Sequence, residues 1–346
     1  MAIRQIDVAV VGTGWIGEIR ASTCANHPLV RDLYLADVDA KRVERVAQKT
    51  DARTWTADHR ELLERHVDAV IISAAPETLH YPMACDWLRA GKHVLLEKPM
   101  ALALAAADEL VALARAAGVK FTIGYTQRFN PKFAYLKECV ANGSVGRPVT
   151  ALVSRHVSRE IGAKIAGRGE LGPAQMEATH DVDLVLWWMD PARATRVYAQ
   201  AADGIMREPY GLPDSIWMIV TLDSGATATV GAHWNLPLES PGFSGATFEL
   251  ACTDGALFID DSHRDILLST VGKGLMRPLS TMPGQQVGHV YQGPMEDETR
   301  AFIEAVALDK PVLVTPEQAL RVMEVTLAAD LSAERGEPVE LPLPRG

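Results

Sequence analysis

Near its start the chain reads Val8-Ala9-Val10-Val11-Gly12-Thr13-Gly14-Trp15-Ile16-Gly17, a short apolar run followed by the pattern G-x-G-x-x-G. An apolar strand that enters such a turn and continues as a helix is typical of a dinucleotide-binding βαβ unit. Gly12 permits the tight turn, Gly14 lets the backbone approach a pyrophosphate, and Gly17 lets the helix pack close to the sheet. The helix start offers its N–H groups and positive dipole end to the phosphates. We therefore expect a dinucleotide to contact Gly12, Gly14, Trp15, Ile16 and Gly17.

Short apolar runs alternate with longer amphipathic segments from this stretch to Gly124. The predicted strands are residues 8–11, 33–36, 69–73, 93–96 and 119–123, and the predicted helices are residues 16–26, 40–49, 78–90 and 104–117. Fully apolar strands that alternate with helices predict a parallel sheet covered on both faces. We therefore expect residues 1–124 to form an α/β dinucleotide-binding domain with a doubly wound Rossmann sheet.

The pattern changes after Gly124. Strands with one polar face are predicted at residues 149–157, 216–222, 226–234, 247–252 and 256–260, helices at 179–189, 296–308 and 316–334, and a long loop at 272–293. Asp223-Ser224-Gly225 and Thr253-Asp254-Gly255 are typical hairpin turns. Residues 125–346 are therefore predicted to form a second, α+β domain with an open, largely antiparallel sheet.

Asp37 ends the second predicted strand, 20 residues after Gly17. An acidic side chain there binds the ribose 2′-hydroxyl of NAD and repels the extra phosphate of NADP. Lys41 and Arg42 follow closely and can soften that preference. Ser73 ends another strand at the same edge of the sheet, where ligands of such sheets bind. We expect NAD rather than NADP, with contacts from Asp37 and Ser73.

Lys98 lies in the run Val94-Leu95-Leu96-Glu97-Lys98-Pro99, just after a predicted apolar strand. A lysine at the carboxyl edge of the sheet can donate a hydrogen bond to a substrate oxygen and stabilise developing negative charge. Alternatively, it is a strand-end lysine whose stem covers apolar surface while its ammonium reaches water. Taken alone, the residue favours this second, structural interpretation, and only its context in the chain reverses that preference.

Composition limits the classes of function. A length of 346 residues with 48% hydrophobic and 23% charged residues predicts two globular domains, and a net charge of −10 argues against binding to nucleic acid or anionic membranes. No apolar run is long enough for a membrane span, and no Cys/His spacing indicates a metal site. We expect a cytoplasmic protein with free thiols at Cys24, Cys85, Cys139 and Cys252.

Five motifs together resemble the Gfo/Idh/MocA oxidoreductase family, and the resemblance covers essentially the whole chain. They are Gly12–Gly17, Pro76-x-x-x-His80, Ala90-Gly91-Lys92-His93-Val94-Leu95-Leu96-Glu97-Lys98-Pro99, Gly124-Tyr125-x-x-Arg128-Phe129-Asn130-Pro131 and His180-x-x-Asp183. The resemblance implies NAD(P)-dependent oxidation or reduction of a sugar, cyclitol or related polyol. It also implies that the open sheet of the second domain often forms an oligomer interface, so we expect a homodimer or homotetramer.

The resemblance also assigns roles to residues. Lys98 is implied to be a catalytic residue that touches the reacting oxygen, and His180 the acid/base. Further cofactor contacts are expected from His80, Glu97, Lys98 and Arg128, although Arg128 can equally bind substrate or tie the domains together. Substrate contacts are expected from Lys98, Tyr125, Arg155, Glu177, His180 and Asp183.

The segment around His180 is predicted to begin a helix with Thr179 as its N-cap. A histidine in a first turn has a pKa that small effects tune around neutrality, but a lone helical histidine is also compatible with a purely structural role. Many family members carry an aspartate four residues before this histidine, where this chain has Met176. Either His180 works with Lys98 alone, or Glu177 or Asp183 supplies the missing carboxylate.

Two alternatives stay open. Met176, with Arg155 and Arg159, would also suit a carboxylated ring compound, such as a cis-dihydrodiol or a semialdehyde hemiacetal of aromatic catabolism. A non-catalytic NAD-sensing protein would keep the same fold. We expect a small-molecule substrate in either enzymatic case.

Overall fold

The computed structural model describes residues 4–345 except 170, 241–243, 262–267, 273 and 277–284. As far as these residues are described, one compact unit comprises Met1–Asn130 with Thr281–Leu320, and the other comprises Pro131–Ser280 with Arg321–Gly346. The segment that ends at Leu320 belongs to the first of these units, and the domain boundary predicted after Gly124 stays a prediction. No described helix combines the length and apolarity needed to cross a membrane.

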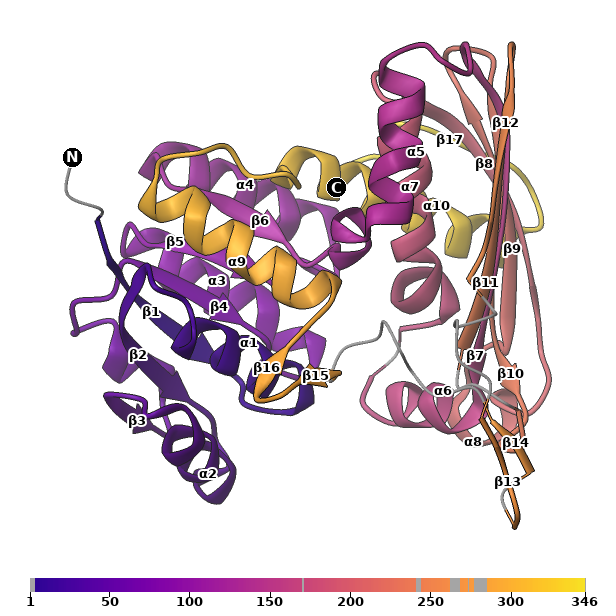
Figure 1. Cartoon of the computed structure of the whole chain (residues 1–346). Coiled ribbons are helices and arrows are strands. Elements are labelled where there is room, and N and C mark those ends of the chain that lie inside the picture. Colours follow the sequence, from indigo (N-terminus) through magenta and orange to yellow (C-terminus); the bar gives the residue numbers. More distant parts are fainter. Residues whose placement is uncertain are drawn as a thin grey trace. The chain divides into compact units, whose positions relative to one another are not determined.

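The first unit contains a six-stranded sheet in which every neighbouring pair is parallel (Figure 1). Its spatial order is β3 (Thr54–Thr56), β2 (Val30–Ala36), β1 (Ile6–Val11), β4 (Ala69–Ile72), β5 (His93–Leu96) and β6 (Phe121–Ile123). β1 and β4 are buried along their whole length, as expected for central strands with both faces covered. The predicted Rossmann sheet is therefore confirmed. The short edge strand β3 was not predicted, because three residues give no apolar run.

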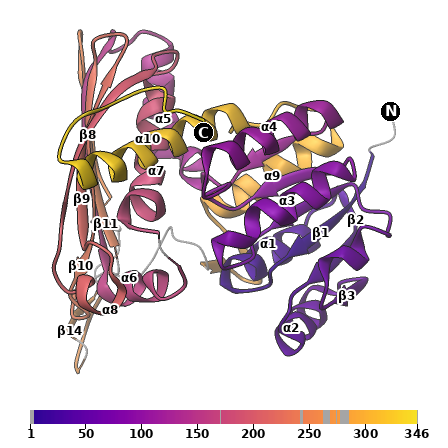
Figure 2. The same cartoon turned by 180° about the vertical axis from the view of Figure 1, so that it is seen from behind.

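Helices cover both faces of this sheet (Figures 1 and 2). They are α1 (Trp15–Ala25), α2 (Ala40–Thr50), α3 (His80–Arg89), α4 (Leu104–Ala117) and α9 (Pro294–Ala307), with short turns η1 (His59–Leu62), η2 (Glu77–Leu79) and η3 (Thr126–Phe129) and a ribbon of β15 (Gln286–Val287) and β16 (Val290–Tyr291). On one face, α1, α2 and α9 share a buried apolar core with the strands. α3 and α4 pack together on the other face. α9 is thus an integral part of the nucleotide-binding fold, although it lies far along the chain.

The second unit contains a seven-stranded sheet in which only the β7–β10 pair is parallel. Its order is β12 (Ala256–Asp260), β11 (Ser244–Cys252), β7 (Pro148–Ser158), β10 (Thr227–Leu236), β9 (Ser215–Leu222), β8 (Ala194–Ala202) and β17 (Val339–Glu340). The predicted largely antiparallel sheet is confirmed. β8 and β17 were not predicted, and part of the predicted loop 272–293 lies outside the described residues.

Helices lie on one face of this second sheet and leave the other open (Figure 1). They are α5 (Pro131–Ala141), α6 (Arg159–Ala166), the π-helical turn η4 (Ala174–Ala178), α7 (Thr179–Trp188), α8 (Arg207–Tyr210) and α10 (Pro316–Arg335), and a small ribbon is formed by β13 (Leu268–Thr270) and β14 (Gly274–Met276). Phe133, Trp188 and Phe248 form a buried aromatic contact between α5, α7 and β11. On the open face, Leu152 and Ile219 remain about half exposed.

The start of α7 differs from the sequence prediction. Thr179 has helical backbone angles and follows directly on η4, so it does not cap the helix, and Ala178 takes the cap position without a side-chain hydrogen bond. The prediction failed because a polar residue before an apolar run resembles an N-cap even when the preceding residues are already helical. His180 therefore lies inside a continuous helical segment that begins at Ala174.

Candidate functional site

Two fingerprint glycines are required by the packing of the loop itself. Gly12 has a φ of +84°, and a Cβ there would lie 2.7 Å from the backbone of Ala74. A Cβ on Gly17 would lie 1.7 Å from the carbonyl oxygen of Gly12. The loop can therefore form its turn, and α1 can approach it, only with glycine at both positions.

Gly14 has a different environment. No described heavy atom outside its chain neighbours lies within 4 Å of a Cβ built at this position, and its φ of −63° is open to any residue. Gly14 is also the N-cap of α1 and has no side chain that could cap the N–H groups of that helix. The hydroxyl of Ser73, on the strand end beside the loop, is buried and has no partner among the described residues. Open space, helix N–H groups and an unsatisfied hydroxyl fit the phosphates of a dinucleotide.

Asp37 is held in place by the glycine loop and by α2. Its Oδ2 accepts hydrogen bonds from the backbone amide of Thr13 at 2.6 Å and from the Thr13 hydroxyl at 3.0 Å. Arg42 binds both carboxylate oxygens, at 3.0 and 2.6 Å. Burial acts to raise the pKa of Asp37, but the hydrogen bonds from Arg42, the Asp39 amide and Thr13 outweigh it and bring that pKa below its ordinary value. Asp37 is therefore an ionised acceptor at the end of β2.

The turn that carries Lys98 starts at the same edge of the sheet. The amide of Glu97 donates to the carbonyl of Ile72 at 2.9 Å, which continues the β5–β4 pairing to the edge. On the other side of Lys98, the carbonyl of Pro99 is 2.7 Å from Nδ1 of the buried His80. Nε2 of the same ring is 2.9 Å from the carbonyl of Ala74. His80 thus connects the Lys98 turn to the loop that follows β4.

The junction residues after β6 are buried in the first unit. Tyr125 is 2% exposed, and Arg128 is equally buried. Nη1 of Arg128 donates to Oε1 of Gln318 at 2.7 Å and to the carbonyl of Leu313 at 3.3 Å. These bonds join η3 to the chain that leads into α10, so Arg128 holds that returning segment within the first unit.

In the second unit, Arg155 on β7 forms a buried bidentate ion pair with Asp181 on α7, at 2.8 and 2.5 Å. Burial acts to lower the pKa of Arg155, but the charge and hydrogen bonds of Asp181 outweigh it and raise that pKa above its ordinary range. The guanidinium therefore has a carboxylate of the protein as its partner. Arg159, which begins α6, donates from Nε to the carbonyl of Asn235 at 3.3 Å.

The residues just before His180 combine a carboxylate with an apolar cluster. Trp234 donates from its indole Nε1 to Oε1 of the buried Glu177 at 3.2 Å. Met176 is 3% exposed and packs in a cluster of buried side chains that includes Trp234, Val157 and Met206. Asp183, on α7, is fully buried. Apolar packing thus explains why methionine is suited to position 176.

Comparison with known proteins identifies the family. Residues 6–125 match the model of an oxidoreductase family with an NAD-binding Rossmann fold, and residues 133–258 match the Gfo/Idh/MocA C-terminal domain. A myo-inositol 2-dehydrogenase of Thermotoga maritima is 34% identical over 345 residues, which cover 96% of this chain and 98% of that protein. The chain belongs to the Gfo/Idh/MocA family.

Other members of the Gfo/Idh/MocA family extend the comparison. A scyllo-inositol 2-dehydrogenase (NAD(+)) of Bacillus subtilis is 27% identical over 347 residues, covering 99% of this chain and 98% of that protein. The structure of scyllo-inositol dehydrogenase from Lactobacillus casei, with bound NAD(H) and scyllo-inositol, has a TM-score of 0.83 at 21% identity and covers 97% of this chain and 99% of that one. This protein is thus an NAD-binding oxidoreductase, a dehydrogenase that acts on CH–OH groups.

Within the Gfo/Idh/MocA fold, each unit gathers part of the predicted site. In the first, the glycine loop, Asp37, Ser73 and the Lys98 turn lie at the carboxyl edge of the sheet. In the second, Glu177, His180 and Asp183 follow one another along η4 and α7, and Arg155 binds Asp181 on the same helix. Sequence reasoning overlooked Asp181 and also Arg20. Arg20 is three residues after Gly17, on the helix face that packs against the sheet, and that position was the available signal.

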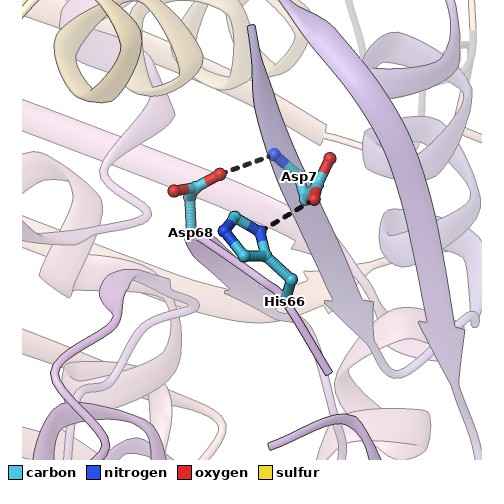
Figure 3. Close-up of side chains that lie close together, drawn as sticks. All are labelled: Asp7, His66 and Asp68. Atoms are coloured by element: carbon cyan, nitrogen blue, oxygen red, sulfur yellow. Dashed lines mark hydrogen bonds and ion pairs between the residues drawn. The ribbon is translucent and has the colours of Figure 1, made fainter. Parts of the chain in front are cut away.

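Asp7, His66 and Asp68 form a group of metal-ligating type (Figure 3). Asp7 lies near the start of β1 and Asp68 directly precedes β4, so the group lies at the amino edge of the first sheet. Their ligand atoms lie within 4.8 Å of one another. Arg31 binds the carboxylate of Asp7, and Arg4 donates to Asp68 at 2.9 Å. His66 Nδ1 is 3.0 Å from Asp7 and its side chain is 75% exposed. Arginines already balance both carboxylates, so we assign no metal to this group.

Proposed function

We propose that this dehydrogenase uses NAD to oxidise, or NADH to reduce, a secondary alcohol or carbonyl carbon of a sugar, cyclitol or related polyol. The support for the substrate class comes from full-length relatives named as inositol dehydrogenases. The observation that carries the cofactor assignment is the open space beside Gly14, next to the uncapped start of α1 and the ionised Asp37. We propose that the dinucleotide binds there, in the N-terminal domain.

NAD is proposed over NADP because of Asp37. Its carboxylate is ionised, buried and tied to Thr13, so it cannot move away from a 2′-phosphate without breaking those bonds. Arg42 is the cation that would attract such a phosphate, but both of its contacts with Asp37 would then be lost. A ribose 2′-hydroxyl, in contrast, can donate to the same carboxylate.

We propose that Lys98 and His180 are the catalytic residues. Bound NAD supplies the ring that accepts or returns the hydride. The ammonium of Lys98 donates a hydrogen bond to the substrate oxygen and stabilises the negative charge that develops on it. His180 takes the hydroxyl proton during oxidation and returns it during reduction. The C-terminal domain is the proposed source of the substrate contacts Glu177 and Asp183, and Tyr125 is proposed as a contact from the junction. Arg155, whose guanidinium already binds Asp181, is proposed to support this region without binding substrate itself.

The structure offers less support for a carboxylated ring substrate. That alternative relied on Arg155 and Arg159 as a carboxylate clamp, but Arg155 already has the carboxylate of Asp181 as its partner. The apolar packing of Met176 provides a structural reason for that residue without any substrate. Polyol oxidation is therefore the better supported proposal.

We also propose self-association through the open face of the second sheet. One cross-strand row on that face contains Phe258, Glu249, Leu152, Thr229 and Ile219. Phe258 is 72% exposed and Ile219 is 48% exposed. Exposed apolar side chains that lie together on one face are typical of a protein–protein interface. Light scattering should show a dimer or tetramer. Ile219→Glu should dissociate it, whereas Tyr135→Glu, at an exposed site on α5, should leave it intact.

A cytoplasmic location is proposed from the four free thiols.

The test of the proposed function is a substrate panel. Inositols, sugars, other polyols and carboxylated ring diols are each offered with NAD and with NADP, and reduced cofactor is followed by its absorbance. Turnover of polyols with NAD supports the proposal. Turnover of the carboxylated compounds alone would favour the alternative substrate. NADH binding, measured by fluorescence, without turnover of any compound would favour a non-catalytic NAD-sensing protein.

A further inference from the structure

Arg20 connects three separate parts of the first unit through one buried guanidinium. It lies on α1, three residues after the glycine fingerprint, and its side chain is fully buried. Nε and Nη2 donate to Oε1 of Glu97 at 3.0 and 2.5 Å. Nη2 also donates to Oε2 of Glu298 at 2.7 Å, and Nη1 donates to the hydroxyl of Thr299 at 3.0 Å. The last two partners lie on α9, nearly 280 residues further along the chain.

Glu97, which Arg20 holds, is the residue immediately before Lys98. Its amide is fixed to the carbonyl of Ile72, and its carboxylate lies so close to Gly124 that a Cβ there would be 2.9 Å from Oε2. The backbone after Lys98 is fixed as well, through the bond between Pro99 and His80. Lys98 therefore lies between two anchored residues, and Arg20 provides the side-chain anchor on one side.

The charges in this cluster explain why the anchor is an arginine. The side chains of Glu97 and Glu298 are only 16% and 3% exposed, so their negative charges need a buried cation. Burial acts to lower the pKa of Arg20, but the two carboxylates outweigh it and raise that pKa above its ordinary range. A planar guanidinium can donate to three side chains in fixed directions, whereas a lysine ammonium is a flexible point charge.

We propose that Arg20 is a positioning residue for the reaction: it ties the Glu97–Lys98–Pro99 turn to α9 and so fixes the place of the Lys98 ammonium. The inference rests on the proposed catalytic role of Lys98. It assigns to α9 a part in the reaction that its distance along the chain conceals. Small displacements of a catalytic group reduce turnover strongly, so loosening this anchor should lower kcat more than it weakens cofactor binding.

The anchor is tested from both of its ends. Arg20→Lys keeps the positive charge but loses the planar guanidinium that donates to three side chains at once. Glu298→Gln removes the charge of one of these partners on α9. Glu304→Gln is the matched control, because Glu304 is a half-exposed acid on the same helix whose one described ion pair is with Lys310. We measure kcat and KM for the polyol, the Kd for NADH by fluorescence, and thermal unfolding. We expect kcat to fall roughly 10- to 100-fold in both test variants, with the Kd for NADH within about threefold and Glu304→Gln unchanged.

A double-mutant comparison separates positioning from a general loss of fold. If Arg20 acts through Lys98, then Arg20→Lys should have little further effect on the residual rate of a Lys98→Ala enzyme. The proposal would be overturned if Arg20→Lys lowered kcat by the same factor in the wild-type and in the Lys98→Ala enzyme. It would also be overturned if the Arg20→Lys and Glu298→Gln proteins folded and kept an unchanged kcat. A loss confined to NADH affinity would make Arg20 a cofactor-site residue instead. Should Arg20→Lys not fold, Glu298→Gln with and without Lys98→Ala gives the same comparison.

Failure of the proposed function has a different signature. Near-normal turnover by Lys98→Ala would show that Lys98 is not the catalytic residue, whatever Arg20 does. An inactive Lys98→Ala enzyme together with full kcat in Arg20→Lys and Glu298→Gln would overturn only the role of Arg20.

Discussion

The backbone amide of Thr13 donates a 2.6 Å hydrogen bond to the carboxylate of Asp37, which joins the middle of the glycine loop to the end of β2. Two features of the dinucleotide fingerprint, the loop for the phosphates and the acid for the ribose, are therefore one connected structure in this protein. Changes to Asp37 should alter cofactor choice and should also loosen the loop.

Asp37→Ser should shift cofactor preference toward NADP. The change removes the buried negative charge and frees Arg42 to bind a 2′-phosphate. We expect the ratio of kcat/KM for NADP to that for NAD to rise about tenfold or more, which corresponds to roughly 1.4 kcal/mol. Asp32→Ser, on the same strand at an exposed ion pair with Arg53, is the control and should leave the ratio unchanged. An unaltered ratio in Asp37→Ser would show that this carboxylate does not face the ribose.

Gly14→Ala and Gly17→Ala should have opposite consequences. No described atom obstructs a Cβ at Gly14, so that variant should lose less than about 1 kcal/mol of stability. It should nevertheless weaken NADH binding about tenfold or more, because the methyl group occupies the space for the pyrophosphate. Gly17→Ala must displace the carbonyl of Gly12 and should lower stability by ~1–3 kcal/mol. Urea unfolding and NADH fluorescence measure the two effects, and tight binding by Gly14→Ala would contradict the proposed cofactor position.

Lys98→Ala should lower kcat by roughly 100-fold or more, while the Kd for NADH stays within a few-fold. The ammonium is proposed to act on developing charge at the substrate, so its loss affects turnover and not the recognition of the phosphates and ribose. Lys92→Ala, just before β5 on the same segment, is the control for loss of a positive charge. Steady-state kinetics and NADH fluorescence provide the measurements. Near-normal kcat in Lys98→Ala would remove the central residue of the mechanism.

The sequence predicted the Rossmann sheet well because its strands are buried on both faces and therefore read as continuous apolar runs. It also located Asp37 and Lys98 at the carboxyl edge, since strand ends follow directly from that pattern. It did not reveal the ion pairs of Arg20 and Arg155, because their partners lie far away in the chain and no local pattern relates them. The false N-cap at Thr179 has the same origin, since helical continuity with η4 depends on packing beyond the local sequence.

Met176→Asp should destabilise the protein by several kcal/mol, because it places a carboxylate among buried apolar side chains such as Val157 and Met206. Met176→Leu keeps the volume and should cost less than about 1.5 kcal/mol. Chemical unfolding of the two variants gives the comparison. A stable Met176→Asp protein with higher turnover of inositols would instead show that position 176 contacts the substrate and selects for it.

Glu296→Gln should become relatively more stabilising as the pH rises. Glu296 on α9 is fully buried, neither carboxylate oxygen has a partner among the described residues, and burial raises its pKa to about 7. The folded protein therefore holds a proton that the unfolded chain releases near its ordinary carboxyl pKa of about 4.3. The contribution of this proton to the free energy of unfolding is fully present below the pKa of the unfolded chain. It is lost as the pH rises toward the folded-state pKa of about 7. From about pH 5 to about pH 8, the free energy of unfolding of Glu296→Gln relative to the wild type should increase by up to ~3 kcal/mol. Urea unfolding across this range tests the prediction. A difference that does not change with pH would mean that Glu296 stays ionised in the folded protein.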